Sequence, residues 1–309
     1  MRRLALAAAG LLAAGPAPAQ TPTPPVFSAS VDTVYVDAFV LRDGQPVRDL
    51  TAAHFEVVDE GILRTPELVR APGGDTLPLV AVLAFDTSGS VVGPKLRALQ
   101  VAGAAFLSNL ADADEASLLT FNEEVAWLVP PTADKAQVAR ALSTVKPEGG
   151  TAVYDGIFAA VMAPSSRART LVVVFSDGDD NVSWLQEDEV KQALARSNAL
   201  VHVVGLVAPK GQTTTLRQES AWRVEMAETR HVSLLRQLAE STGGRFWPAD
   251  SAERLRAVFA DIAAAMRDRY VLRFEPPPGA APGWRRLKVR LKNASGDVQA
   301  RRGYWTRPR

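Results

Sequence analysis

The segment LVAVLAFDTSGS, residues 79–90, decides the fold of this chain. Its first seven residues form an unbroken apolar run of strand length, which is typical of a strand buried on both faces. Asp86 ends the run, and Ser88 and Ser90 follow at alternate positions around a glycine. One carboxylate and two hydroxyls are therefore expected at the carboxyl end of a strand, where open α/β sheets bind ligands. Hard divalent cations such as Mg²⁺ prefer oxygen ligands of this kind.

Two later segments extend this set of oxygen ligands. Gly149-Gly150-Thr151 lies in a turn-rich stretch and offers a further hydroxyl. The segment LVVVFSDG, residues 171–178, is a second buried-strand pattern and contains Asp177 at its end. Two strand-ending carboxylates at one sheet edge would repel each other unless a cation lay between them.

The D-x-S-x-S loop at residues 86–90, the later threonine and the strand-ending S-D-G at residues 176–178 resemble the von Willebrand factor type A family and its metal-ion-dependent adhesion site. The resemblance covers roughly residues 78–266 and implies a doubly wound α/β domain with a mostly parallel sheet. In the family pattern the hydroxyls bind the metal directly, and the aspartates bind it directly or through water. An acidic residue of a protein partner then completes the coordination. Carried over residue by residue, the implied metal ligands are Asp86, Ser88, Ser90, Thr151 and Asp177.

The same residues also have a simpler interpretation as helix caps. The loop 86–90 could cap a helix beginning near Gly93, and Thr151 could cap one beginning at Ala152. Capping does not explain why Asp177 ends a second strand, so the metal interpretation is favoured.

For other residues near the motif, the sequence supports only less specific predictions. Residues 179–181 are expected to form a solvated turn, with Asp179 able to tune the metal site. Asp155 would either support the metal ligands or only face solvent, and the sequence does not decide between these. Glu123-Glu124 are expected in a solvated turn, and Trp127 is expected to pack against the core.

The chain has 309 residues, of which 47% are hydrophobic, and its formal net charge is +1. It contains no cysteine, so disulfides are excluded. The start Met1-Arg2-Arg3, an apolar core and Ala17-Pro18-Ala19 are typical of a cleaved secretory signal. We therefore expect a bacterial protein that is exported, to the periplasm or beyond the cell, with no membrane span after cleavage.

The expected organisation is a signal peptide at 1–19, a linker at 20–26, N-terminal strands at 27–76, the A-type domain at 77–269 and C-terminal strands at 270–309.

Alternating polar and apolar residues predict strands at both ends of the chain. Early strands are expected at 27–41, 55–61 and 65–69, and late strands at 270–274, 286–291 and 298–304. We expect the two groups to pair into a β-sandwich in which the A-type domain is inserted. The run D-G-x-P-V-x-D-L-T at residues 43–51 and the strand Tyr270–Phe274 resemble secreted bacterial proteins of the acidobacterial type that carry an A-type domain.

Strand patterns alternate with helix patterns between the two ends, which favours a parallel sheet covered on both faces. Strands are expected at 79–85, 115–121, 171–176, 200–207 and 245–247. Helices are expected at 93–110, 133–145, 152–162, 187–197, 233–241 and 251–269, with Asp134 and Ser251 at helix starts. The polar stretch 209–230 is expected to be an inserted loop.

Several function classes find no support. The near-neutral charge does not favour nucleic acid. The three histidines lack metal-ligand spacing, and no G-x-S-x-G elbow or phosphate-binding glycine loop occurs, so the chain is not expected to be an enzyme. The favoured function is cation-dependent protein binding or adhesion at the cell envelope or outside the cell, with Mg²⁺, or else Mn²⁺ or Ca²⁺, bridging to an acidic residue of a partner. The alternatives are a structural scaffold that the metal only stabilises and, with less support, a metal-assisted hydrolase.

Overall fold

The computed structural model describes residues 33–73, 78–163, 169–176, 180–206 and 218–306, with the backbone alone for 218–229. The signal peptide and linker expected at residues 1–26 lie outside these ranges. Among the described residues, no helix is both long enough and apolar enough to span a membrane.

The centre of the A-type region is a mixed sheet that has six strands in the described part of the chain. The strand order is β11-β10-β9-β6-β7-β8, and only the edge strand β8 runs antiparallel to its neighbour. The bounds are β6 Val80–Asp86, β7 Glu115–Phe121, β8 Val125–Thr132, β9 Thr170–Ser176, β10 Leu200–Leu206 and β11 Phe246–Ala249. Every residue of β6 is buried, as the continuous apolar pattern predicts for a central strand.

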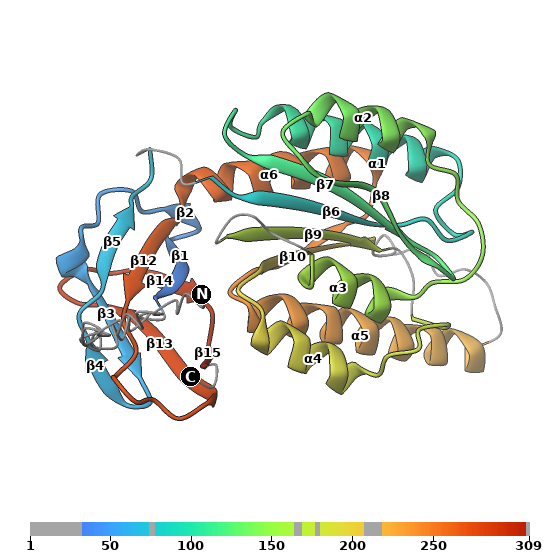
Figure 1. Cartoon of the computed structure of the whole chain (residues 1–309). Helices are drawn as coiled ribbons and strands as arrows, with labels where there is room; N and C mark the ends of the chain where they lie inside the picture. Colours follow the sequence, from blue (N-terminus) through green and yellow to red (C-terminus); the bar gives the residue numbers. More distant parts are fainter. Residues whose placement is uncertain (1–32, 74–77, 164–168, 177–179, 207–217, 307–309) are drawn as a thin grey trace, which may run out of the picture. The chain divides into compact units, whose positions relative to one another are not determined.

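Helices cover both faces of this sheet (Figure 1). One face carries α1 Pro94–Ser108, α2 Lys135–Thr144 and α6 Ala252–Asp268, and the other carries α3 Val153–Val161, α4 Glu187–Arg196 and α5 Gln218–Ser241. Asp134 and Ser251 accept hydrogen bonds from the backbone N–H groups of Gln137 and Arg254, so both predicted helix starts are confirmed.

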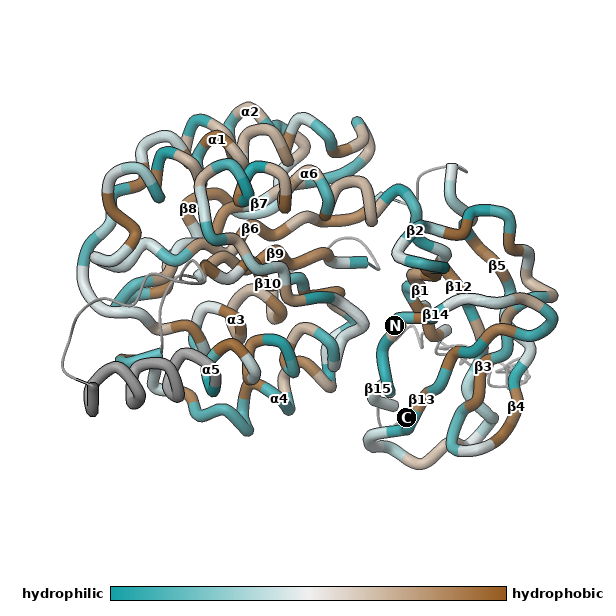
Figure 2. The backbone as a smooth tube through the Cα atoms, turned by 180° about the vertical axis from the view of Figure 1, so that it is seen from behind, coloured by the Kyte–Doolittle hydropathy of each residue, from teal (hydrophilic) through white to brown (hydrophobic). Residues whose placement is uncertain are grey.

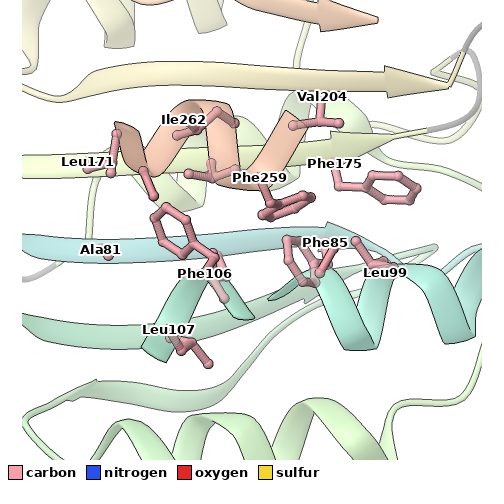
Figure 3. Close-up of a cluster of buried hydrophobic side chains, with 14 of the residues drawn as sticks. Ala81, Phe85, Leu99, Phe106, Leu107, Leu171, Phe175, Val204, Phe259 and Ile262 are labelled. Carbon is pink, nitrogen blue, oxygen red and sulfur yellow. The ribbon is translucent and has the colours of Figure 1, made fainter. Parts of the chain in front are cut away.

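Each face of the sheet has its own hydrophobic core. Figure 3 shows the core beneath α1 and α6, where the rings of Phe85, Phe106 and Phe259 meet edge to face. Alternate residues of β6 enter opposite cores, because successive strand side chains point to opposite faces. In the hydropathy view the strands β6 and β9 are hydrophobic along their length, whereas much of α4 is hydrophilic (Figure 2).

Strands from both ends of the chain build two further antiparallel sheets. In the described ranges, one sheet has the order β14-β1-β12-β5 with β2 beside β1, and the other has the order β15-β13-β3-β4. The bounds are β1 Val34–Arg42, β2 Gln45–Pro46, β3 Phe55–Asp59, β4 Ile62–Arg64, β5 Glu67–Arg70, β12 Tyr270–Phe274, β13 Gly283–Leu291, β14 Asp297–Ala300 and β15 Gly303–Thr306; a short 3₁₀ turn spans Ala52–His54. The two sheets share one core, to which β1, β3, β12 and β13 all contribute.

Early and late strands are direct neighbours in both sheets. Val34 of β1 lies opposite Phe274 of β12, and Val57 of β3 lies opposite Val289 of β13. The expected single strand at 298–304 is wrong, since the chain leaves one sheet after Ala300 and joins the other at Gly303. Buried Arg301 sits at this break, where its Nε donates to the Gly303 carbonyl.

Two expectations within the A-type region are also wrong. Residues 218–230, which were expected in a loop, belong to α5, because Glu, Ala, Arg and Met dominate this stretch and are strong helix formers. Residues 209–217 lie outside the described ranges. Strand β8 was not expected. It contains Pro130-Pro131, and prolines are tolerated here because β8 is an edge strand.

Candidate metal centre

Asp86 is the last residue of β6, and its side chain is held from two sides. Its Oδ1 accepts a hydrogen bond from the Ser88 N–H at 2.9 Å, and its Oδ2 accepts one from the Ser176 hydroxyl at 2.8 Å. Ser176 ends β9, the parallel neighbour of β6. Asp86 is 0% exposed, so its orientation is set by these contacts and not by solvent.

The two serines of the loop after β6 lie side by side. The hydroxyl oxygens of Ser88 and Ser90 are 2.9 Å apart. Ser88 is buried, whereas Ser90 is exposed. The structure thus brings Asp86, Ser88 and Ser90 together and places one hydroxyl of the group at the surface.

Backbone hydrogen bonds join this loop to the loop that carries Thr151. The Gly89 N–H donates to the Gly149 carbonyl at 3.0 Å, and the Glu148 N–H donates to the Thr87 carbonyl at 2.8 Å. Thr151 itself is buried and exchanges two hydrogen bonds with Asn181, from its N–H to the Asn181 Oδ1 at 2.9 Å and from the Asn181 N–H to its carbonyl at 3.0 Å. Three loops at one sheet edge are therefore tied together.

The turn before Thr151 requires glycine. Gly149 has a φ of +72°, in the left-handed region, and a Cβ on Gly150 would lie 2.8 Å from the Asn181 Oδ1. The Gly150 N–H donates to the Glu123 Oε1 at 3.0 Å. Glu123, although exposed, therefore does more than form the expected solvated turn, because it holds the threonine loop.

The loop after β9 is anchored to the start of α3. The Asp155 carboxylate accepts hydrogen bonds from the Trp184 and Leu185 N–H groups at 2.9 and 3.0 Å, and the Asp180 Oδ2 accepts one from the Tyr154 N–H at 3.1 Å. Asp155 therefore orders a loop beside the centre. Asp180 and Asn181 therefore do more than form the expected solvated turn: Asn181 is exposed, but both residues accept hydrogen bonds from backbone N–H groups that would otherwise lack partners.

Sequence reasoning gave Asn181, Ser176 and Glu123 no role in the site. The available signal was the run of Asp and Asn after residue 176, since short polar side chains commonly bind nearby backbone groups. That signal does not say which backbone groups are bound. Thr151 and Tyr154, whose N–H groups bind Asn181 and Asp180, lie 26 to 30 residues away, so only the folded chain identifies these contacts.

The helix-cap interpretation of these residues is wrong. Helix α1 begins after Gly93 and α3 begins after Ala152, and neither cap residue makes a side-chain capping hydrogen bond. The predicted ligand Asp177 and its neighbour Asp179 lie outside the described residues.

The donor set fits a hard divalent cation. It consists of oxygen atoms only, from the Asp86 carboxylate and the hydroxyls of Ser88, Ser90 and Thr151. In the described part of the chain, no group of three or more His, Asp or Glu side chains could hold a metal. The set of Asp86, Ser88, Ser90 and Thr151 has more neutral than charged oxygen ligands. It would suit Mg²⁺ or Mn²⁺, with water or a carboxylate from outside the chain in the remaining coordination positions.

Large apolar side chains are exposed in the loops of this edge. Val92, two residues after Ser90, is 53% exposed, and Val182 in the loop after β9 is 39% exposed. Trp184 in the same loop is 90% exposed, although its backbone N–H is held by Asp155. A large aromatic side chain on a well-anchored loop is a feature of binding surfaces.

Comparison with known proteins agrees with the fold of the A-type region. Residues 81–179 match the family model of the von Willebrand factor type A domain, so this part of the chain is a domain of that type. A UPF0353 protein of Mycolicibacterium paratuberculosis is 26% identical over 204 residues, which cover 59% of each chain. Human inter-alpha-trypsin inhibitor heavy chain H4 is 30% identical over 127 residues, 36% of this chain and 14% of that protein.

The chain thus spans less than two thirds of the length of these curated relatives. Among solved structures, a von Willebrand factor type A protein from Catenulispora acidiphila aligns with a TM-score of 0.50 and 13% identity. That alignment covers 89% of this chain and 72% of the other. At this level of identity the likeness concerns the fold alone.

Proposed function

We propose that this chain is a divalent-cation-dependent protein-binding module. Asp86, Ser88, Ser90, Thr151 and Asp177 would hold Mg²⁺, Mn²⁺ or Ca²⁺, and the bound cation would offer a Lewis-acidic position to a carboxylate of a partner protein. The single observation that carries the proposal is the joining of the Asp86 loop and the Thr151 loop by two backbone hydrogen bonds. These bonds hold the hydroxyl donors in one place before any ligand arrives, which reduces the entropy lost on binding.

The residues around this centre would have different roles. Ser176 orients the Asp86 carboxylate, and Asn181 holds the backbone on both sides of Thr151. Exposed Ser90 marks the side from which a partner would approach. Trp184 and Val92 would supply apolar contact beside a carboxylate bound at the cation.

We further propose that the A-type domain at 77–269 is inserted between the strands at 27–76 and 270–309, which form one β-sandwich. The direct pairing of β1 with β12 and of β3 with β13 supports this division. Export to the cell envelope or beyond is proposed on the signal-like pattern of residues 1–19.

The test is calorimetric titration of Mg²⁺, Mn²⁺ and Ca²⁺ into the wild-type chain and into Asp86→Ala. We expect saturable binding by the wild type and its loss in the variant, because Asp86 is the one described carboxylate of the donor set. Asp112→Ala, which changes an exposed carboxylate elsewhere, is the matched control and should bind as the wild type does. Asp86→Asn keeps the side-chain shape and separates loss of charge from loss of fold. Equal cation affinity in wild type and Asp86→Ala would contradict the proposal.

A structural role for the metal is the second candidate. It is favoured by the fact that both Asp86 oxygens already accept hydrogen bonds from the chain itself. In that case a chelator would lower the melting temperature and leave partner binding unchanged. If binding to a partner selected in Mg²⁺ is instead lost in chelator, the adhesive role is the correct one.

A further inference from the structure

A second candidate binding site lies at the opposite edge of the six-stranded sheet, where β6 and β9 begin. A pocket of about 150 Å³ opens there. The side chains that bear on its chemistry are the apolar Leu79, Phe106, Leu171 and Met266 and the basic Arg70 and Arg269. Because both hydrocarbon and guanidinium groups line it, the pocket is amphipathic.

The basic side of this pocket belongs to a buried arginine cluster, which consists of Arg70, Arg169 and Arg269. These residues are only 6%, 8% and 4% exposed. Arg169 and Arg269 both donate to one carboxylate oxygen, the Asp37 Oδ1, the latter at 2.9 Å. Arg70 donates to the backbone carbonyls of Arg267 and Arg269 at 3.2 and 3.0 Å.

Nearby carboxylates neutralise the arginine cluster only in part, because Asp37 is shared by two of its three arginines. Asp114 also lines the pocket, but its two oxygens accept hydrogen bonds from the Leu79 and Ala111 N–H groups at 3.1 and 3.0 Å. Asp268 is paired with Arg48 at 2.8 Å. Burial lowers the pKa of Arg269 to about 10 and also lowers the pKa of Arg70; the charge of Arg169 lowers both pKa values further, whereas the charge of Asp37 raises both. Positive charge is therefore concentrated beside the pocket.

The described residues satisfy the guanidinium of Arg169 only in part. Its Nε and Nη1 are buried without a hydrogen-bond partner in the described structure. A buried charged donor without an acceptor is costly, and such groups are commonly satisfied by a ligand, an ion or water. Arg169 does not itself line the pocket, but it shares the Asp37 Oδ1 with Arg269, which does, so its guanidinium lies next to a pocket-lining one.

We infer that this pocket binds a small amphipathic carboxylate of about the size of benzoate. The carboxylate would be held by the arginine cluster, because planar guanidinium groups match carboxylate geometry. The ring or short chain would lie against Phe106, Leu171 and Met266. A dry apolar cavity of roughly 150 Å³ accommodates benzene, so the volume suits one ring. Inorganic phosphate fits less well, since its oxygens would face apolar side chains without hydrogen bonds.

The test is calorimetric titration of sodium benzoate into the full chain, beside its neutral isostere benzamide and inorganic phosphate. We expect saturable binding of benzoate, with benzamide and phosphate at least about tenfold weaker, as the loss of one charge-assisted hydrogen bond predicts. Benzoate should also raise the melting temperature, because it binds the folded state alone. Failure of benzoate to bind at about 10 mM, or phosphate binding as tightly as benzoate, would overturn the inference.

Two variants locate the site. Arg169→Met keeps the apolar stem and removes the unsatisfied guanidinium, and it should weaken benzoate by at least about tenfold. Arg140→Met, at an exposed arginine of α2, is the matched control and should leave benzoate affinity unchanged. Because Arg169 also pairs with Asp37, Ala263→Phe provides an independent variant that fills the pocket without changing any charge. Benzoate affinity that survives Ala263→Phe in a folded protein would place the ligand elsewhere and contradict the inference.

Discussion

At the residue scale, His202 illustrates how burial decides the chemistry of a side chain. It lies in the central part of β10 with no exposed surface, as expected for a packed core histidine. Its Nδ1 accepts hydrogen bonds from the Arg245 N–H at 3.0 Å and the Trp247 Nε1 at 3.2 Å. Burial, together with the charge of Arg245, lowers the pKa of His202 from its ordinary 6.5 to about 3. The imidazole therefore stays neutral in the folded protein at pH values where the unfolded chain binds a proton.

The pKa of His202 predicts a loss of stability in acid. Below pH 6.5 the unfolded state gains a proton that the folded state does not bind, down to the folded pKa of about 3. The free energy of unfolding should therefore fall by roughly 1 kcal/mol per pH unit in this window because of His202. Urea denaturation at pH 7 and pH 5 measures the effect, and His202→Gln, which cannot titrate, should show the smaller difference. An identical difference in the two proteins would contradict the assignment.

At the scale of single elements, close packing between α3 and the sheet sets the position of the Thr151 loop. Gly156 of α3 faces the ring of Phe121 so closely that a Cβ would overlap it. Phe121 ends β7, and the next residue, Asn122, accepts the Ala152 N–H at 2.8 Å. The contact therefore positions the first turn of α3 and, directly before it, the candidate ligand Thr151.

Gly156→Ala should destabilise the protein by about 2 kcal/mol, because overpacking against a buried ring outweighs the helix propensity of alanine. Gly103→Ala in α1 is the matched control. There the new Cβ would meet the flexible end of Leu142 at 2.7 Å and the Phe85 ring at 3.2 Å, and the cost should stay below about 1 kcal/mol. Denaturation midpoints of both variants measure the contrast. A larger loss for Gly103→Ala than for Gly156→Ala would contradict the packing argument.

At the scale of the whole chain, residues far apart in sequence hold the sheet β15-β13-β3-β4 together. Asp59 of β3 is fully buried and accepts hydrogen bonds from the Arg285 Nε at 3.0 Å, the Arg285 Nη2 at 2.9 Å and the Tyr304 hydroxyl at 3.2 Å. Burial and the charge of Asp59 raise the pKa of Tyr304 to about 12. This contact joins the beginning of the chain to strands more than 200 residues later.

Asp59→Ala should lower the free energy of unfolding by about 3 kcal/mol, because it leaves a largely buried guanidinium without its partner. Glu56→Ala, on the same strand, breaks the more exposed ion pair with Arg290 and should cost less than about 1 kcal/mol. Urea titration of the two variants compares the buried pair with the exposed one. Equal losses would show that the Asp59 contact adds nothing beyond a surface ion pair.

Local sequence predicted most elements because their patterns depend only on which face is buried. The apolar runs that became β6, β7, β9 and β10 and the starts of α2 and α6 were all recognisable. The edge strand β8 and the first part of α5 were missed. The prolines of β8 weaken the strand pattern there, and the polar composition of residues 209–230 is typical of a loop.

The sequence by itself determined the A-type fold and the order Asp86, Ser88 and Ser90 at a strand end, because residues so close in the chain must lie together once the strand forms. Only the tertiary structure decided how the loops meet. The Thr151 N–H binds Asn181, the Gly150 N–H binds Glu123, and the Trp184 N–H binds Asp155. The tertiary structure also decided that Arg169 and Arg269 both bind Asp37, from which they are 132 and 232 residues away in the sequence. Such contacts depend on the crossing of distant segments, which periodicity and short motifs do not encode.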